Sequence, residues 1–235
     1  MIQTSQISTG MQYSVDIVLC IDTTGSMGPI LEHVKENALS FHDQLGSAMA
    51  SKGRSISQLR LKVIAFRDFA DRAEDAVHQT DFLPFPDRAP DFESFVGGLR
   101  SAGGGDAPES GLEALALAIG SEWERGLDRR RHVIVLFTDA PAHPLGSPSQ
   151  VQAAGYPQSV PRSMDALFQQ WGFAHSQDAL MENSAKRLLL FAPESEPWVD
   201  ISEDWNNCLY FPSNAGEGLE EWEMDEIINS IANSL

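Results

Sequence analysis

The sequence predicts a single α/β domain in which a mostly parallel sheet lies between two layers of helices. Apolar runs typical of buried strands alternate with segments of helical periodicity along the chain. Residues with side-chain oxygens follow several of these runs, at the position where ligands bind in parallel sheets. The chain has 235 residues, a length that suits one such domain and is short for two.

Six segments are predicted to be strands because each is a short apolar run bounded by polar or turn-forming residues. The third is the weakest, since Pro84 and Pro86 limit the hydrogen bonds it can make, and it is expected at an edge of the sheet. The predicted strands cover residues 15–21, 59–66, 77–85, 132–137, 187–191 and 208–211.

Helices are predicted in the segments between these strands. Pro29 suits the first turn of a helix that Gly46 or Gly53 ends. The S-x-x-E pattern from Ser110 to Glu113 is typical of a capping box and predicts a helix start. Further helices are predicted over residues 91–96, around 164–168, over 176–186 and from about residue 218 to the C-terminus.

The chain is expected to form one folded domain over residues 13–235, preceded by a flexible segment over residues 1–12. The first residues are polar and rich in Ser, Thr and Gln, a composition that does not support a packed core. Residues 140–175 are rich in Pro, Gly, Ser and Gln and are interpreted as a long insert, in which Trp171 looks exposed. Loops of this length commonly carry function.

The charge balance excludes some classes of partner. The net charge is −18, with 34 acidic and 16 basic side chains, which argues against nucleic-acid binding because that function needs a basic face. The first residues lack the basic and apolar regions of a signal peptide, and no apolar stretch is long enough to span a membrane. A cytoplasmic protein with no membrane partner is therefore expected.

Oxygen-bearing side chains are predicted to meet at one edge of the sheet. Asp22, Thr24 and Ser26 alternate directly after the first strand, so neighbours two positions apart can point the same way. Asp68 and Asp139 each follow another predicted strand. The carboxyl ends of parallel strands lie at one edge, so these groups are expected to converge. Carboxylates and hydroxyls are typical ligands of a hard divalent cation.

These residues resemble the metal-ion-dependent adhesion site of von Willebrand factor A domains. The resemblance rests on Asp22-x-Thr24-x-Ser26, a glycine-rich loop over residues 103–109 and Thr138-Asp139, and it covers nearly the whole chain. It implies a three-layer, doubly wound, mostly parallel sheet of six strands with one antiparallel edge strand. It also implies a bound Mg²⁺, with Mn²⁺ or Ca²⁺ as alternatives, and a partner protein whose Asp or Glu completes the metal shell.

The second part of the site resembles that of integrin β-chain domains. Asp106-Ala107-Pro108-Glu109 is similar to their D-x-P-E stretch, which implies that Glu109 is the loop ligand of the metal. The implied ligand set is therefore Asp22, Thr24, Ser26, Glu109 and Asp139. The same resemblance implies a second, adjacent cation site made by Asp68, Asp106, the Pro108 carbonyl and Glu109.

The sequence-based hypothesis is a non-catalytic, Mg²⁺-dependent protein-interaction module. The chain also resembles stand-alone bacterial proteins of this family, which implies a Ser/Thr kinase or phosphatase partner in stress signalling. In one alternative the metal is structural and partners bind the insert over 140–175. In another the chain is a serine hydrolase with Ser26 as nucleophile, Asp139, and His143 or His175 as base.

Overall fold

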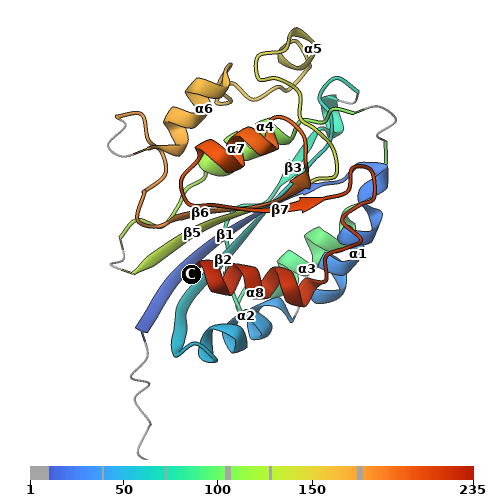
Figure 1. Cartoon of the computed structure of the whole chain (residues 1–235). Helices are drawn as coiled ribbons and strands as arrows, with labels where there is room; N and C mark the ends of the chain where they lie inside the picture. The colour runs from blue at the N-terminus through green and yellow to red at the C-terminus, as the bar shows by residue number, and fades with distance from the viewer. Residues whose placement is uncertain (1–10, 39, 72, 104–106, 127–128, 174–176) are drawn as a thin grey trace, which may run out of the picture.

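The computed structural model describes most of the chain, and its central feature is a seven-stranded mixed sheet (Figure 1). Strands β1 (Met11–Asp22), β2 (Arg54–Phe66), β5 (Arg130–Phe137), β6 (Lys186–Pro193) and β7 (Cys208–Ser213) pair in parallel. The strand order is β3-β2-β1-β5-β6-β7, and β4 also pairs with β2. The described residues are 11–38, 40–71, 73–103, 107–126, 129–173 and 177–235.

The predicted fold class is confirmed, but the sheet has seven strands and not six. The segment predicted as one edge strand divides into β3 (Val77–Gln79) and β4 (Leu83–Phe85), both antiparallel to β2. The Thr80 N–H still donates to the Val63 carbonyl, and the Thr80 hydroxyl oxygen accepts from the Val63 N–H. After Thr80 the chain no longer pairs with β2 until β4 begins. It returns with Pro84 opposite Arg60, at an edge where a proline without an N–H is tolerated.

Helices cover both faces of the sheet (Figure 1). One layer contains α1, α2, α3 and α8, and the other contains α4, α5, α6 and α7. The bounds are α1 Gly28–Asn37, α2 Phe41–Ala50, α3 Ala89–Gly98, α4 Gly111–Ile119, α5 Pro148–Val151, α6 Met164–Trp171, α7 Trp198–Asp204 and α8 Met224–Ser234. Strand β1 shows why two layers are needed: Ile17 and Leu19 lie in one core cluster, and Val18 and Cys20 lie in the other.

Three helix predictions differ from the structure. The helix beginning near Pro29 is two helices, α1 and α2, and the last helix begins at Met224, well after residue 218. The predicted helix over 176–186 is wrong. The described residues 177–185 form turns, and the backbone N–H groups of Leu180 and Met181 donate to the Gln170 carbonyl at the end of α6. Met181 is 3% exposed and belongs to the core cluster on this side of the sheet, so tertiary contacts override the local helical pattern.

The described part of the 140–175 insert, residues 140–173, is part of the core, because it contains α5 and α6 and covers one face of the sheet. The expectation that Trp171 is exposed is wrong, since its exposed fraction is 0%. Its indole N–H donates to the Asn206 carbonyl at 3.1 Å, and its ring stacks on Trp205. In the described part of the chain, no helix has the length and apolar character needed to cross a membrane.

Candidate metal centre at the strand ends

Hydroxyl groups from two strand ends converge on the carboxylate of Asp22. Asp22 is the last residue of β1 and is fully buried. Its Oδ1 accepts hydrogen bonds from the Thr24 backbone N–H at 2.9 Å and from Thr24 Oγ1 at 2.7 Å. Thr138 Oγ1, just beyond β5, donates to Oδ2 at 2.8 Å. A hydroxyl that donates its proton to Asp22 presents its oxygen lone pairs to other groups.

A second carboxylate, that of Asp139, lies beside the exposed Ser26. Ser26 Oγ donates to Asp139 Oδ1 at 3.0 Å, which joins the turn after β1 to the end of β5. Asp139 Oδ2 accepts from the Gly218 backbone N–H at 2.8 Å. The structure therefore places four of the predicted ligands in two hydrogen-bonded pairs, Asp22–Thr24 and Ser26–Asp139. The two pairs are neighbours because Thr138, which donates to Asp22, directly precedes Asp139.

The loop before α8 closes this end of the sheet at Gly218, which sequence reasoning missed. Gly218 has a φ of +62°, and a Cβ placed there would lie 2.1 Å from the Ser26 carbonyl oxygen. Only glycine combines this left-handed backbone with so close an approach. The signal available in the sequence was the Gly216–Gly218 spacing, but nothing local indicates that this loop reaches Ser26.

Burial makes the charge on Asp22 costly. Desolvation raises the pKa of Asp22 to about 6, although the hydrogen bonds from Thr24 and Thr138 act in the opposite direction. The nearby carboxylate of Asp139 makes a smaller contribution to this raised pKa. A divalent cation beside these oxygens would favour the ionised form, so the residues present fit a hard cation in donor chemistry and charge.

Glu109 lies on the loop between α3 and α4. Glu109 is 4% exposed. Its backbone N–H donates to the Pro141 carbonyl at 2.9 Å, and its carbonyl accepts from the His143 N–H at 2.9 Å. Within the described ranges, no three His, Cys, Asp or Glu side chains converge closely enough to hold a metal ion. The described centre thus consists of two carboxylates and hydroxyls, and Glu109 as a ligand stays a prediction.

The second predicted cation site is only partly described. Asp106 lies outside the described residues, and Pro108 is half-buried on the same loop as Glu109. The Asp68 carboxylate accepts hydrogen bonds from the Ala70 N–H at 2.9 Å and from the Gln150 side chain, and it lies 3.3 Å from His143 Nε2. Asp68 therefore joins the loop after β2 to the insert.

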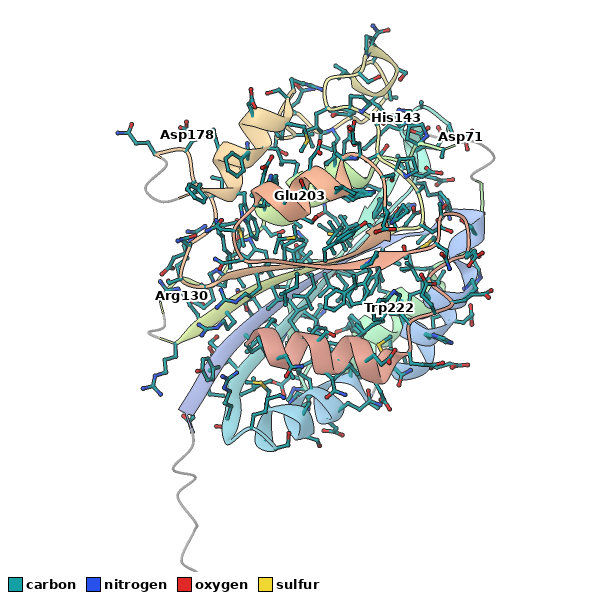
Figure 2. All side chains as sticks on the ribbon, viewed as in Figure 1. Asp71, Arg130, His143, Asp178, Glu203 and Trp222 are labelled. Atoms are coloured by element: carbon teal, nitrogen blue, oxygen red, sulfur yellow. The ribbon has the colours of Figure 1, made fainter. Side chains whose placement is uncertain are left out.

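The geometry around Ser26 differs from that of a serine nucleophile with a histidine base. The Ser26 hydroxyl donates to the carboxylate of Asp139. His143, which Figure 2 shows above the sheet in the layer of α4 and α7, has its Nε2 beside Asp68. His175, the other proposed base, lies outside the described residues.

The predicted capping box at the start of α4 does not form, because tertiary contacts use both side chains. The helix begins at Gly111 as expected, and no side chain caps it. Ser110 Oγ donates to Gln150 Oε1 at 2.7 Å and accepts from the Phe69 N–H at 3.0 Å. The carboxylate of Glu113 accepts from Tyr156 Oη at 3.0 Å, which ties the insert to α4.

Replacing Glu113 with glutamine is expected to stabilise the fold at neutral and alkaline pH. Glu113 is 0% exposed, and burial raises its pKa to about 7 from an ordinary value of 4.5. The pKa of Glu113 is higher in the folded state than in the unfolded state. The protonated Glu113 therefore contributes its full stabilisation below about pH 4.5, and this stabilisation is lost as the pH rises through about 7. The gain at pH 8 should be about 1–3 kcal/mol.

Urea unfolding at pH 5 and pH 8 measures this effect, with the exposed Glu93→Gln on α3 as control. Glutamine keeps the Oε1 acceptor for Tyr156, so the hydrogen bond itself is preserved. A variant that loses stability equally at both pH values would contradict a raised pKa of Glu113, because a raised pKa makes the effect depend on pH.

Comparison with known proteins identifies the family. The family model described as von Willebrand factor A domain matches residues 16–158, which include the Asp22, Glu109 and Asp139 segments. The chain belongs to the von Willebrand factor A domain family. This membership indicates a protein-interaction module, and the fold described above agrees with it.

Two relatives are similar to part of this chain and are much longer proteins. The chain is 26% identical to the alpha-protein kinase vwkA of Dictyostelium discoideum over 150 residues, 64% of this chain and 22% of the kinase. It is 25% identical to a putative ariadne-like RING finger protein of Acanthamoeba polyphaga mimivirus over 132 residues, 56% of this chain and 12% of that protein. The chain thus spans less than a quarter of each relative.

A solved structure gives the same picture of the fold. The pilus adhesin SpaC of Lactobacillus rhamnosus GG, in its open conformation, aligns with a TM-score of 0.53 at 12% identity. The alignment covers 95% of this von Willebrand factor A domain and 30% of the adhesin chain. At this identity the likeness concerns the fold alone.

Proposed function

We propose that this von Willebrand factor A domain binds partner proteins through a divalent cation, Mg²⁺ in preference to Mn²⁺ or Ca²⁺. The observation that carries the proposal is the convergence of Asp22, Thr24, Ser26 and Asp139 at the ends of β1 and β5. These oxygens match the preference of Mg²⁺ for hard ligands with some coordinated water. When bound, the cation would supply a Lewis-acidic position for a carboxylate from the partner.

The chain's own residues prepare this position. The Thr24 hydroxyl donates its proton to Asp22, and the Ser26 hydroxyl donates its proton to Asp139. The lone pairs of both hydroxyl oxygens are therefore available to the cation. Ser26 is the exposed member of the set, and it is proposed to be a metal ligand and not a nucleophile. Glu109 is proposed as the loop ligand, and Asp68, Asp106 and the Pro108 carbonyl as a second site.

The class of partner is a further part of the proposal. A Ser/Thr kinase or phosphatase presenting an Asp or Glu is proposed, with the chain acting as a cytoplasmic signalling adaptor of the stand-alone bacterial type. The relative named as an alpha-protein kinase supports an association of this domain type with kinases. The kinase activity is a property of that longer protein.

Affinity capture with the immobilised chain tests the proposal. Partner proteins are captured in 5 mM MgCl₂, a concentration on the order of 100 times an assumed Kd for Mg²⁺ of about 50 µM. Their capture should be lost in EDTA and lost equally with the Ser26→Ala variant. Capture that survives both changes but fails in Gln152→Arg and Gln158→Arg would favour binding through the insert. Both glutamines are exposed, so these variants leave the buried Trp171 in place.

A further inference from the structure

A groove of about 420 Å³ lies between α6 and α7, and neither the family site nor the proposed function uses it. In Figure 1 α6 lies above the sheet toward its left end, whereas the turn from β1 into α1 is at the right. The groove is formed by the insert and by the helix after β6, which are far apart in sequence. It is therefore a product of the tertiary fold.

The floor of the groove is apolar and aromatic. Met164 and Phe168 come from one face of α6, and Ile201 and Trp205 come from α7 and its end. Each pair is separated by four residues, so its members are neighbours along one side of a helix. Phe168 contacts the ring of Trp205, with centroids 5.9 Å apart, and also stacks on Phe173 at 6.2 Å.

Phe173 extends this aromatic surface to solvent. Its exposed fraction is 56%, the highest among the large apolar side chains in the described part of the chain. Toward the core, Phe168 contacts Trp205, and Trp205 in turn stacks on the buried Trp171. A ring that is exposed on one side and stacked on the other offers a rigid apolar contact at small entropic cost.

The rim of the groove is acidic. Asp165, Asp200 and Asp204 line it, and all three are exposed. None of them forms an ion pair with a described residue. Asp200 and Asp204 are four residues apart on α7, so two like charges face the same side of a seven-residue helix. Cations from a partner would relieve this repulsion.

We propose that this groove, which we call the α6–α7 groove, binds a basic amphipathic segment of a partner protein. Aromatic or aliphatic side chains of the segment would lie on Phe168 and Trp205, and its Lys or Arg residues would face the three carboxylates. The net charge of −18 favours approach of such a segment and disfavours acidic ones. The binding requires no metal, so it is independent of the proposed cation site.

A labelled Leu/Lys model helix of about 14 residues, long enough to span both helices, is the probe. Its binding is measured by fluorescence anisotropy in EDTA, against a peptide with Glu in place of Lys. The chain is expected to bind the basic peptide with a Kd tighter than about 100 µM and to ignore the acidic one. Weaker binding of the basic peptide would overturn the proposal.

Matched variants separate the groove from general attraction by an acidic protein. The triple variant Asp165→Asn, Asp200→Asn, Asp204→Asn should weaken binding by at least about tenfold. The control triple Glu36→Gln, Asp87→Asn, Glu93→Gln removes the same charge from exposed positions in or beside the opposite helix layer, and it should weaken binding by less than about threefold. Equal losses in the two triples would overturn the proposal.

The apolar half of the proposal has its own test. Phe173→Ser changes an exposed side chain, so folding should be unaffected, and binding of the basic peptide should fall about threefold to tenfold. Hydrogen exchange should show protection over residues 164–171 and 197–205 when the peptide is bound. Protection confined to the acidic groove lined by Asp43 and Asp225 would place the peptide elsewhere and contradict the proposal.

Discussion

Replacing Asp22 with asparagine is expected to abolish stabilisation of the fold by Mg²⁺. At a Mg²⁺ concentration 100 times its Kd, the wild-type chain should gain about 2.7 kcal/mol. For a domain of this size the gain corresponds to a rise of roughly 5–10 °C in Tm. Asparagine keeps the shape of the side chain but removes the charge that favours a cation, so the variant should show almost no rise.

Thermal unfolding in MgCl₂ and in EDTA measures this prediction. In EDTA the variant should unfold at the same temperature as the wild type or higher, because burial raises the pKa of Asp22 and makes its ionised form unfavourable. Asp71→Asn changes an exposed carboxylate on the loop after β2 and should keep the full response to Mg²⁺. A wild-type Tm that does not respond to millimolar Mg²⁺ would contradict the metal site.

Replacing Gly218 with alanine is expected to destabilise the fold and to disturb the candidate metal centre. The added Cβ would lie 2.1 Å from the Ser26 carbonyl oxygen, and the backbone there is left-handed. The strain and the clash together should cost about 2–5 kcal/mol. The loop must move, so the N–H that donates to Asp139 would be displaced with it.

Gly216→Ala is the matched control for this variant. Gly216 also has a left-handed backbone, with a φ of +76°, but a Cβ there meets no atom within 4 Å. Its cost should be limited to about 1–2 kcal/mol. Urea unfolding of both variants therefore isolates the clash with Ser26. If the two variants are equally stable, the close approach of the loop to Ser26 is not present in solution.

The sequence alone determined the fold class and the elements that carry the candidate site. Buried strands and helices have local periodicities, so β1, β2 and β5 were found where apolar runs predicted them. Parallel strands end at one edge of a sheet for geometric reasons, so Asp22 and Asp139 were expected to approach each other there, and Ser26 joins them. The Asp22–Thr24 contact spans only two residues and is likewise a local property.

Only the tertiary structure decided how polar and apolar groups far apart in sequence are paired. The S-x-x-E pattern at Ser110 and Glu113 predicts mutual capping, but buried partners from the insert, Gln150 and Tyr156, take both side chains. A buried polar group must find some partner, and local sequence does not specify which one. Trp171 was misjudged for the same reason, because its partner Trp205 lies beyond two further elements. The α6–α7 groove lies between these same segments, and for this reason local sequence patterns could not predict it either.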